Sequence, residues 1–125
     1  MAGLTLDTGA LIAFERRDRS IAIFLKEALL TGSRITIPTV VLAEGFRGKN
    51  ERRLSELFNM AVLEPLDEGL AKMAGRALAS VRGATPIDSI VMASAARRHD
   101  CVLTSDPLDL LRLRDAFPSV RVARL

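Results

Sequence analysis

The segment Arg34–Glu44, RITIPTVVLAE, contains the unit from which the fold can be built. Its first part, Arg34–Pro38, is a short apolar run that predicts a β-strand. Thr39 can cap a helix over the residues that follow, and this helix carries Glu44 among apolar neighbours. The segment therefore predicts a strand, a tight turn and a helix that presents a carboxylate close to the turn.

The same alternation extends in both directions along the chain. Further strands are predicted at Leu4–Asp7, Ala61–Glu64, Cys101–Thr104 and, at a sheet edge, Val120–Leu125. Helices are predicted from a Ser20 cap to Gly32, over Asn50–Asn59, from an Asp67 cap to Gly83, from Thr85-Pro86, and from Asp106-Pro107. Strands separated by helices predict βαβ units, and so an α/β fold with a central, mainly parallel sheet flanked by helices on both faces.

Length and composition fit one small domain over residues 1–125. The chain has 125 residues, of which 49% are hydrophobic, and it contains no Trp or Tyr. Cys101 is the single cysteine, so no intrachain disulfide can form, and its apolar neighbours favour the interpretation of a buried small hydrophobe. The sequence shows neither a signal peptide nor an apolar run of membrane-spanning length, and we expect a cytoplasmic location with no membrane partner.

The charge balance is mildly basic. Eighteen Lys and Arg stand against fifteen Asp and Glu, and fifteen of the eighteen cations are arginines. Arginine's planar fork suits phosphate contacts, so this balance is compatible with nucleic acid. A GC-rich coding sequence would produce the same bias, and charge alone does not decide between the two.

Four carboxylates are expected at one edge of the predicted sheet. In open α/β sheets, ligands bind outside the carboxyl ends of the strands. Asp7 and Asp106 follow the first and fourth predicted strands, and Glu44 lies just beyond the second. Asp88 falls in the first turn of a helix that should begin at the same edge. The topology therefore predicts that these four acids converge.

Converging carboxylates repel one another unless a cation lies between them. Hard divalent cations prefer oxygen ligands, and Mg²⁺ commonly uses one or two direct carboxylates together with waters. Two ions about 3.5–4 Å apart can activate a water and stabilise the leaving oxygen of a phosphodiester. The sequence thus predicts a site for one or two ions, and Mg²⁺ and Mn²⁺ suit it equally.

Each acid also has a structural interpretation. Asp106 stands at a helix start, and Asp88 stands three residues after Thr85, with a capping-box spacing. Glu44 could be a solvated helix residue, and Asp7 could form a turn at the end of a strand. The functional interpretation depends on the shared edge, and Asp7 supports it best.

Four stretches resemble the signature segments of PIN domains, in the same order. They are Leu6–Ile12 (LDTGALI), Ile37–Glu44 (IPTVVLAE), Pro86–Ala93 (PIDSIVMA) and Val102–Pro107 (VLTSDP). In order, spacing and total length the chain is similar to the VapC-type toxins of prokaryotic toxin–antitoxin pairs. Each motif is weak alone, whereas the ordered set is specific and spans nearly the whole chain.

This resemblance implies a Mg²⁺- or Mn²⁺-dependent endoribonuclease, the toxin of a type II toxin–antitoxin module, which hydrolyses RNA phosphodiesters with a metal-activated water. It also implies a homodimer and an antitoxin protein that inhibits the site. Carried over by motif, the catalytic and metal-binding acids are Asp7, Glu44, Asp88 and Asp106. Supporting groups next to them are Thr8, Thr104 and Asp109.

Three other functions are open to test at this stage. The tripeptide Asp7-Thr8-Gly9 matches aspartic proteases, but that fold is all β, and this chain has at least four helical periodicities. Phosphatases of the haloacid-dehalogenase type need a second aspartate where Gly9 stands. A PIN-like module that binds RNA or protein without cutting it is the main alternative, and Asp7→Asn separates it from a nuclease.

Overall fold

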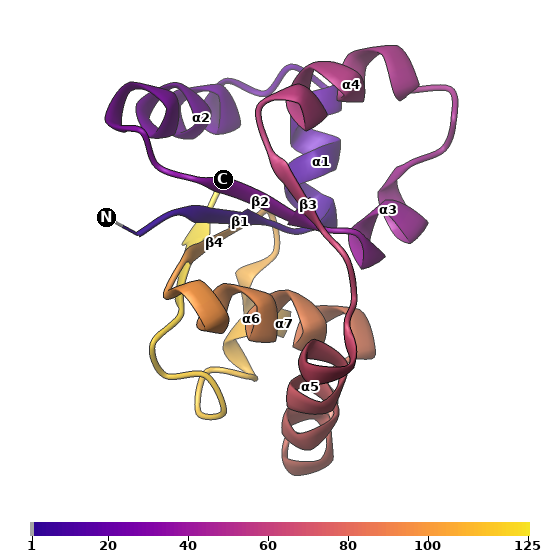
Figure 1. Ribbon diagram of the computed structural model, residues 1–125, viewed down its shortest axis with the longest axis vertical. Helices are drawn as coiled ribbons and strands as arrows, with labels where there is room; N and C mark the ends of the chain where they lie inside the picture. The colour runs from indigo at the N-terminus through magenta and orange to yellow at the C-terminus, as the bar shows by residue number, and fades with distance from the viewer. Residues whose placement is uncertain (1) are drawn as a thin grey trace.

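The computed structural model describes residues 2–125, and a five-stranded sheet lies at its centre (Figure 1). The strands are β1 (Leu4–Leu6), β2 (Ile35–Pro38), β3 (Val62–Glu64), β4 (Cys101–Thr104) and β5 (Arg121–Arg124). Their order is β3-β2-β1-β4-β5, and every neighbouring pair is parallel. The predicted parallel sheet is confirmed, and the carboxyl ends of all five strands share one edge.

Helices cover both faces of this sheet. They are α1 (Thr8–Glu15), α2 (Arg19–Thr31), α3 (Val40–Gly45), α4 (Glu51–Asn59), α5 (Glu68–Ser80), α6 (Pro86–Arg98) and α7 (Pro107–Leu111). Figure 1 shows α1, α2 and α4 above the sheet and α5, α6 and α7 below it. Within residues 2–125, none of these helices has the length and apolar character needed to cross a membrane.

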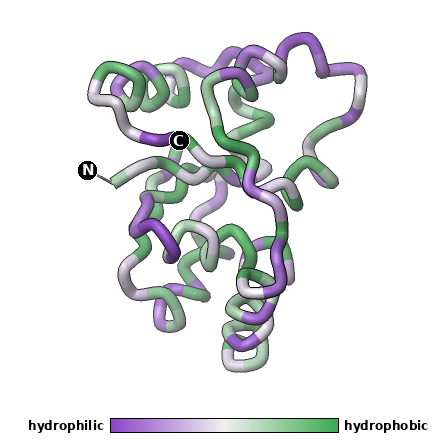
Figure 2. The backbone as a smooth tube through the Cα atoms, viewed as in Figure 1, coloured by the Kyte–Doolittle hydropathy of each residue, from purple (hydrophilic) through white to green (hydrophobic). Residues whose placement is uncertain are grey.

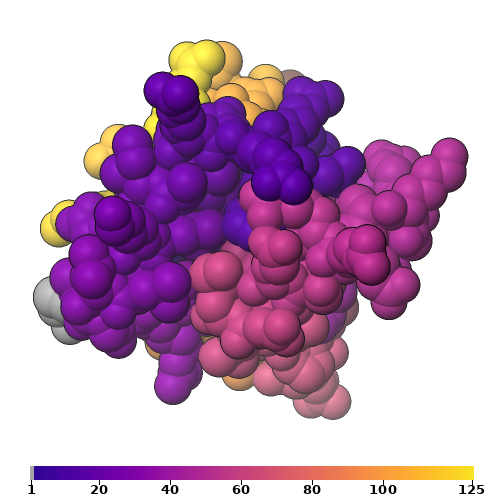
Figure 3. Space-filling model, turned by 90° about the horizontal axis from the view of Figure 1, so that it is seen from above, coloured from indigo at the N-terminus to yellow at the C-terminus, as the bar shows by residue number. Residues whose placement is uncertain are grey.

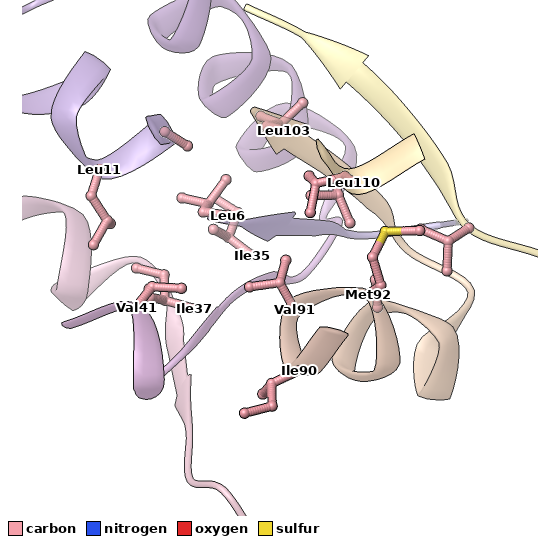
Figure 4. Packing of buried hydrophobic residues seen from close by; sticks show 14 of the residues in the cluster. Leu6, Leu11, Ile35, Ile37, Val41, Ile90, Val91, Met92, Leu103 and Leu110 are labelled. Atoms are coloured by element: carbon pink, nitrogen blue, oxygen red, sulfur yellow. The ribbon is translucent and has the colours of Figure 1, made fainter. Parts of the chain in front are cut away.

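The core lies on both sides of the central strands. Leu6 and Ile37 are fully buried, and Ile35 is nearly so. Figure 4 shows these side chains between Leu11 of α1 above and Val91 of α6 below. Strands enclosed by helices on both faces are buried along their length, which explains the predominantly apolar sequences of β1, β2 and β4.

Helix α1 is absent from the sequence-based expectation. Its residues include Ala10, Leu11, Ala13 and Phe14, all buried, so most of its circumference faces the protein. A helix that is apolar nearly all round has no clear amphipathic stripe, and periodicity therefore does not reveal it. Asp7, expected at the end of a strand, is the N-cap of this helix.

The expected helix ends are only partly correct. Asp67 and Thr85 cap α5 and α6 as predicted, and Gly32 ends α2 in the left-handed conformation. Ser20 is not the cap of α2, because Asp18 holds that position and accepts a hydrogen bond from the Ser20 N–H at 2.9 Å.

Two further helix ends differ from the expectation. Thr39 precedes α3 but makes no capping hydrogen bond, and its own backbone is already helical. Helix α5 ends at Ser80 rather than at Gly83, which lies in the connection to α6 with φ of 81°.

A buried ionic network joins the end of α6 to the sheet. The Arg98 guanidinium contacts Glu64 of β3 and, at 2.9 Å, Asp100, whose side chain is 3% exposed. It also donates to the Thr5 hydroxyl at 3.0 Å and to Ser94 at 2.9 Å. Buried acids away from the candidate site are thus neutralised by a cation.

Candidate active site

Asp7 lies where β1 ends and α1 begins. Its Oδ1 accepts a hydrogen bond from the Ala10 N–H at 3.0 Å, which fixes the partly buried carboxylate. Burial raises the pKa of Asp7, while hydrogen bonds from the Thr104 side chain and the Ala10 N–H oppose the shift. The charge of Asp88 raises this pKa further, so the two carboxylates interact. Asp7 is therefore both the N-cap of α1 and a carboxylate that interacts with Asp88.

Asp88 is the centre of the acidic cluster. It lies in the first turn of α6, where its N–H donates to the Thr85 hydroxyl at 3.2 Å. Burial raises the pKa of Asp88, against the effect of the Thr85 side chain. Three further carboxylates raise this pKa through their charge: Asp109, Glu44 and Asp106. Together with Asp7, these residues form what we call the acidic cluster.

Glu44 is exposed on α3, as its structural interpretation expected, yet its carboxylate is held in place. The Thr8 hydroxyl, on the first residue of α1, donates to Glu44 Oε1 at 2.6 Å. Helix α3 can approach α1 closely because Gly45 follows Glu44. A Cβ on Gly45 would lie 3.3 Å from Leu11 and 3.5 Å from the Thr8 methyl group. The Thr8 hydroxyl thus lies against the Glu44 carboxylate.

Asp106 is exposed at the start of α7 and makes no side-chain capping bond, so capping does not explain it. Its N–H donates to the hydroxyl of Thr104 at 3.0 Å. Thr104 is 1% exposed and also acts on Asp7, so it connects two of the acids. Asp109 is exposed in the first turn of α7, with Arg112 4.0 Å away.

The principal acids lack the cations that neutralise other carboxylates. Within residues 2–125, Asp7, Glu44, Asp88 and Asp106 form no salt bridge. In the same part of the chain, no three Asp, Glu, His or Cys side chains are gathered tightly enough to ligate one ion directly. One or two direct carboxylates with waters would suffice for Mg²⁺. The all-oxygen donor set fits a hydrated divalent cation and does not fit a shell of four direct carboxylates.

Two residues next to these acids, Gly9 and Ser105, were not predicted from the sequence to shape the site. A Cβ on Gly9 would overlap Ser105 Oγ, and it would lie 3.1 Å from Ser105 N and 3.3 Å from Asp7 Oδ1. Because Ser105 precedes Asp106, this contact joins the start of α1 to the turn that carries Asp106. A glycine inside the first turn of a helix is the signal that could have indicated it.

The fold and the site together define an all-parallel α/β domain with uncompensated carboxylates at its strand ends. The family model of the PIN domain matches residues 4–114. The chain therefore belongs to the PIN-domain family, as its four sequence motifs predicted. No curated protein matches its sequence.

Several solved structures share this fold over almost their whole length. VapBC2 from Rickettsia felis, bound to a promoter DNA fragment, has a TM-score of 0.77 and 16% identity, covering 98% of each chain. DNA-bound VapBC from Salmonella typhimurium has a TM-score of 0.69 and 22% identity, covering 99% of this chain and 98% of the other. VapBC-5 from Mycobacterium tuberculosis, a member of the VapBC family of toxin–antitoxin systems, has a TM-score of 0.63 and 28% identity, covering all of both chains.

Proposed function

We propose that this protein is a metal-dependent endoribonuclease, the toxin component of a type II toxin–antitoxin module. The observation that carries the proposal is the acidic cluster around Asp88, in which Asp7, Glu44, Asp88 and Asp106 form no salt bridge within residues 2–125. A divalent cation would relieve their mutual repulsion, and the cluster lies at the strand ends where α/β proteins bind ligands. Mg²⁺ and Mn²⁺ are the ions that this donor set suits.

Asp7, Asp88 and Asp106 would hold a hydrated ion, one or two of them directly and the rest through its waters, with Thr104 orienting Asp7 and Asp106. When bound, a divalent cation supplies charge stabilisation and a water of lowered pKa. Glu44 is suited to position the attacking water. Because Thr8 occupies Glu44 Oε1, the other carboxylate oxygen is available to accept a proton. The predicted products carry a 5′-phosphate and a 3′-hydroxyl.

The partners follow from the family. The VapBC structures above are complexes of toxin–antitoxin systems, and we infer that this chain also binds a cognate antitoxin that blocks the site. We further infer a homodimer, RNA as the substrate, and a cytoplasmic location. Copurification with the antitoxin would mask activity, so tests need the toxin alone.

The test is RNA cleavage by purified protein freed from any partner. We expect cleavage of cellular RNA with Mn²⁺ or Mg²⁺, none with EDTA, and loss of nearly all activity in Asp7→Asn and Glu44→Gln. Cleavage that persists in EDTA would contradict the proposal. Retained RNA binding without cleavage by any form of the protein would favour the alternative of a binding module.

A further inference from the structure

Seven of the eighteen Lys and Arg residues lie in one corner of the molecule. This basic corner consists of residues 15–19, at the end of α1, and residues 47–56, between α3 and the middle of α4. It contains seven Lys and Arg against four Asp and Glu, an excess equal to the formal net charge of +3 for the whole chain. The remaining residues therefore carry equal numbers of formal positive and negative charges.

Asn50 ties the two segments of the corner together. Its side chain is 8% exposed, and its Oδ1 accepts from the Arg47 N–H at 3.2 Å. Its Nδ2 donates to the Gly45 carbonyl at 3.0 Å and to Glu15 at the end of α1. A nearly buried amide with three partners fixes the α3–α4 connection against α1.

Arg53 adds a second tie between the segments. Its guanidinium lies 4.0 Å from the centroid of the Phe14 ring and donates to the Phe14 carbonyl at 3.1 Å. In Figure 2 the backbone along the α1–α2 and α3–α4 connections is coloured largely as hydrophilic, and in Figure 3 indigo and magenta residues of these regions lie side by side. The contacts of Asn50 and Arg53 thus hold the α3–α4 connection against the end of α1.

The corner continues directly from the acidic cluster. Helix α1 begins at Thr8, which holds Glu44, and ends at Glu15 in the corner. The α3–α4 segment of the corner is connected to Glu44 more directly, because Gly45 follows Glu44 and its carbonyl accepts a hydrogen bond from Asn50. Eight helical residues span about 12 Å. A bound chain could therefore reach from the corner to the acids within a few nucleotides.

The cations of the corner are available to a ligand. Arg16, Arg17, Arg47, Lys49 and Arg52 are exposed, and within residues 2–125 none of them forms a salt bridge. The sequence has no Trp or Tyr, and the exposed Lys and Arg side chains of the corner suit contacts to the sugar–phosphate backbone of a single strand.

We propose that the basic corner binds the phosphate backbone of single-stranded RNA and directs it to the acidic cluster. This inference rests on the proposed function for its ligand. It assigns to the corner a role in substrate affinity and not in the chemical step. Each phosphate contact releases counterions, so its loss reduces the salt dependence of binding.

The test compares two triple variants with the same change of charge. Arg47→Gln/Lys49→Gln/Arg52→Gln removes exposed cations of the corner. Arg34→Gln/Arg76→Gln/Arg121→Gln removes three exposed cations elsewhere. Binding of a fluorescent single-stranded RNA is measured in EDTA across a salt series, so that cleavage does not enter.

We expect the corner variant to bind the RNA about tenfold more weakly near 0.1 M salt. The slope of log affinity against log salt concentration should become shallower by about 2, because each phosphate contact with a single strand contributes roughly 0.7. The control should stay within about twofold of wild type and keep its slope. Equal losses in both variants, no loss in the corner variant, or no RNA binding by wild type would overturn the proposal. Cleavage with Mn²⁺ is scored separately: RNA binding through the corner without cleavage contradicts only the proposed nuclease.

Discussion

At the scale of single residues, Asp7 and Asp67 form an instructive pair. Both are N-caps, with Oδ1 accepting from the N–H three residues on, at 3.0 Å for Asp7 and 2.7 Å for Asp67. Burial raises the pKa of Asp7, whereas the hydrogen bonds from Leu70 and Arg97 lower the pKa of Asp67. The same capping geometry therefore accompanies a raised carboxyl pKa at Asp7 and a lowered one at Asp67.

This difference predicts a pH-dependent gain of stability in Asp7→Asn. The folded protein binds the Asp7 proton more tightly than the unfolded chain, whose ordinary pKa is 3.8. The stability from this site is full below that pH and is lost as the pH rises through the raised folded pKa. Asn keeps the capping oxygen, so in EDTA at pH 7 the variant should melt at a higher temperature than wild type. The gain should vanish at pH values below 3.8.

Asp67→Asn is the matched control for this prediction. Its lowered pKa means that the carboxylate contributes stability above pH 3.8, which is lost as the pH falls through the folded pKa. At pH 7 this variant should melt at a lower temperature than wild type. Thermal unfolding curves in which both variants move in the same direction would contradict the assignment of Asp7.

Gly9 provides a prediction about the shape of the site. Ala is normally more stable than Gly inside a helix by about 1 kcal/mol. At position 9 the added methyl would overlap Ser105 Oγ and crowd Ser105 N at 3.1 Å, so Gly9→Ala should destabilise by about 1–3 kcal/mol and weaken Mn²⁺ binding. Adding Ser105→Gly should recover part of both losses.

Gly75→Ala is the control for Gly9→Ala. Gly75 lies in α5, and nothing is within 4 Å of the position its Cβ would take. That variant should gain about 1 kcal/mol in the free energy of unfolding. Denaturant titrations in which Gly9→Ala also gains stability would show that the contact with Ser105 is unimportant.

At the scale of elements, the strands were predictable and α1 was not. A parallel strand is a short apolar run between turns, which one sequence window contains. Helix α1 is buried on most sides, so its periodicity is weak. The location of the acids at one edge could be predicted, because Asp7, Asp88 and Asp106 follow a strand or begin a helix there and Glu44 lies on the short helix after β2. The Arg98 and Asn50 networks join residues up to 93 positions apart, and no local pattern indicates such pairs.

Arg98 links α6 to β1 and β3, and its removal should be costly. Arg98→Met would leave Glu64 and the buried Asp100 without their cation, which should lower the free energy of unfolding by about 3–5 kcal/mol. Lys72→Met, which breaks an exposed pair with Glu68, should change it by less than about 1 kcal/mol. Similar effects of the two substitutions in urea titrations would show that the network contributes little.

At the scale of the whole molecule, negative and positive charges gather at opposite ends of α1. The acidic cluster surrounds Asp88 near the start of α1, and the basic corner lies at the far end of this helix. The parallel topology places the acids, because every strand delivers its following residue to the same edge. The predicted convergence of the acids is therefore a property of the fold, whereas the hydroxyls that orient them depend on side-chain packing.

The central claim is that the acidic cluster is a divalent-cation site, and calorimetric titration of the partner-free protein with Mn²⁺ tests it most directly. We predict saturable binding by wild type, at least tenfold weaker binding by Asp88→Asn, and unchanged binding by Asp67→Asn, whose carboxylate lies outside the cluster. Equal affinity in wild type and Asp88→Asn, or no binding by wild type, would contradict the claim.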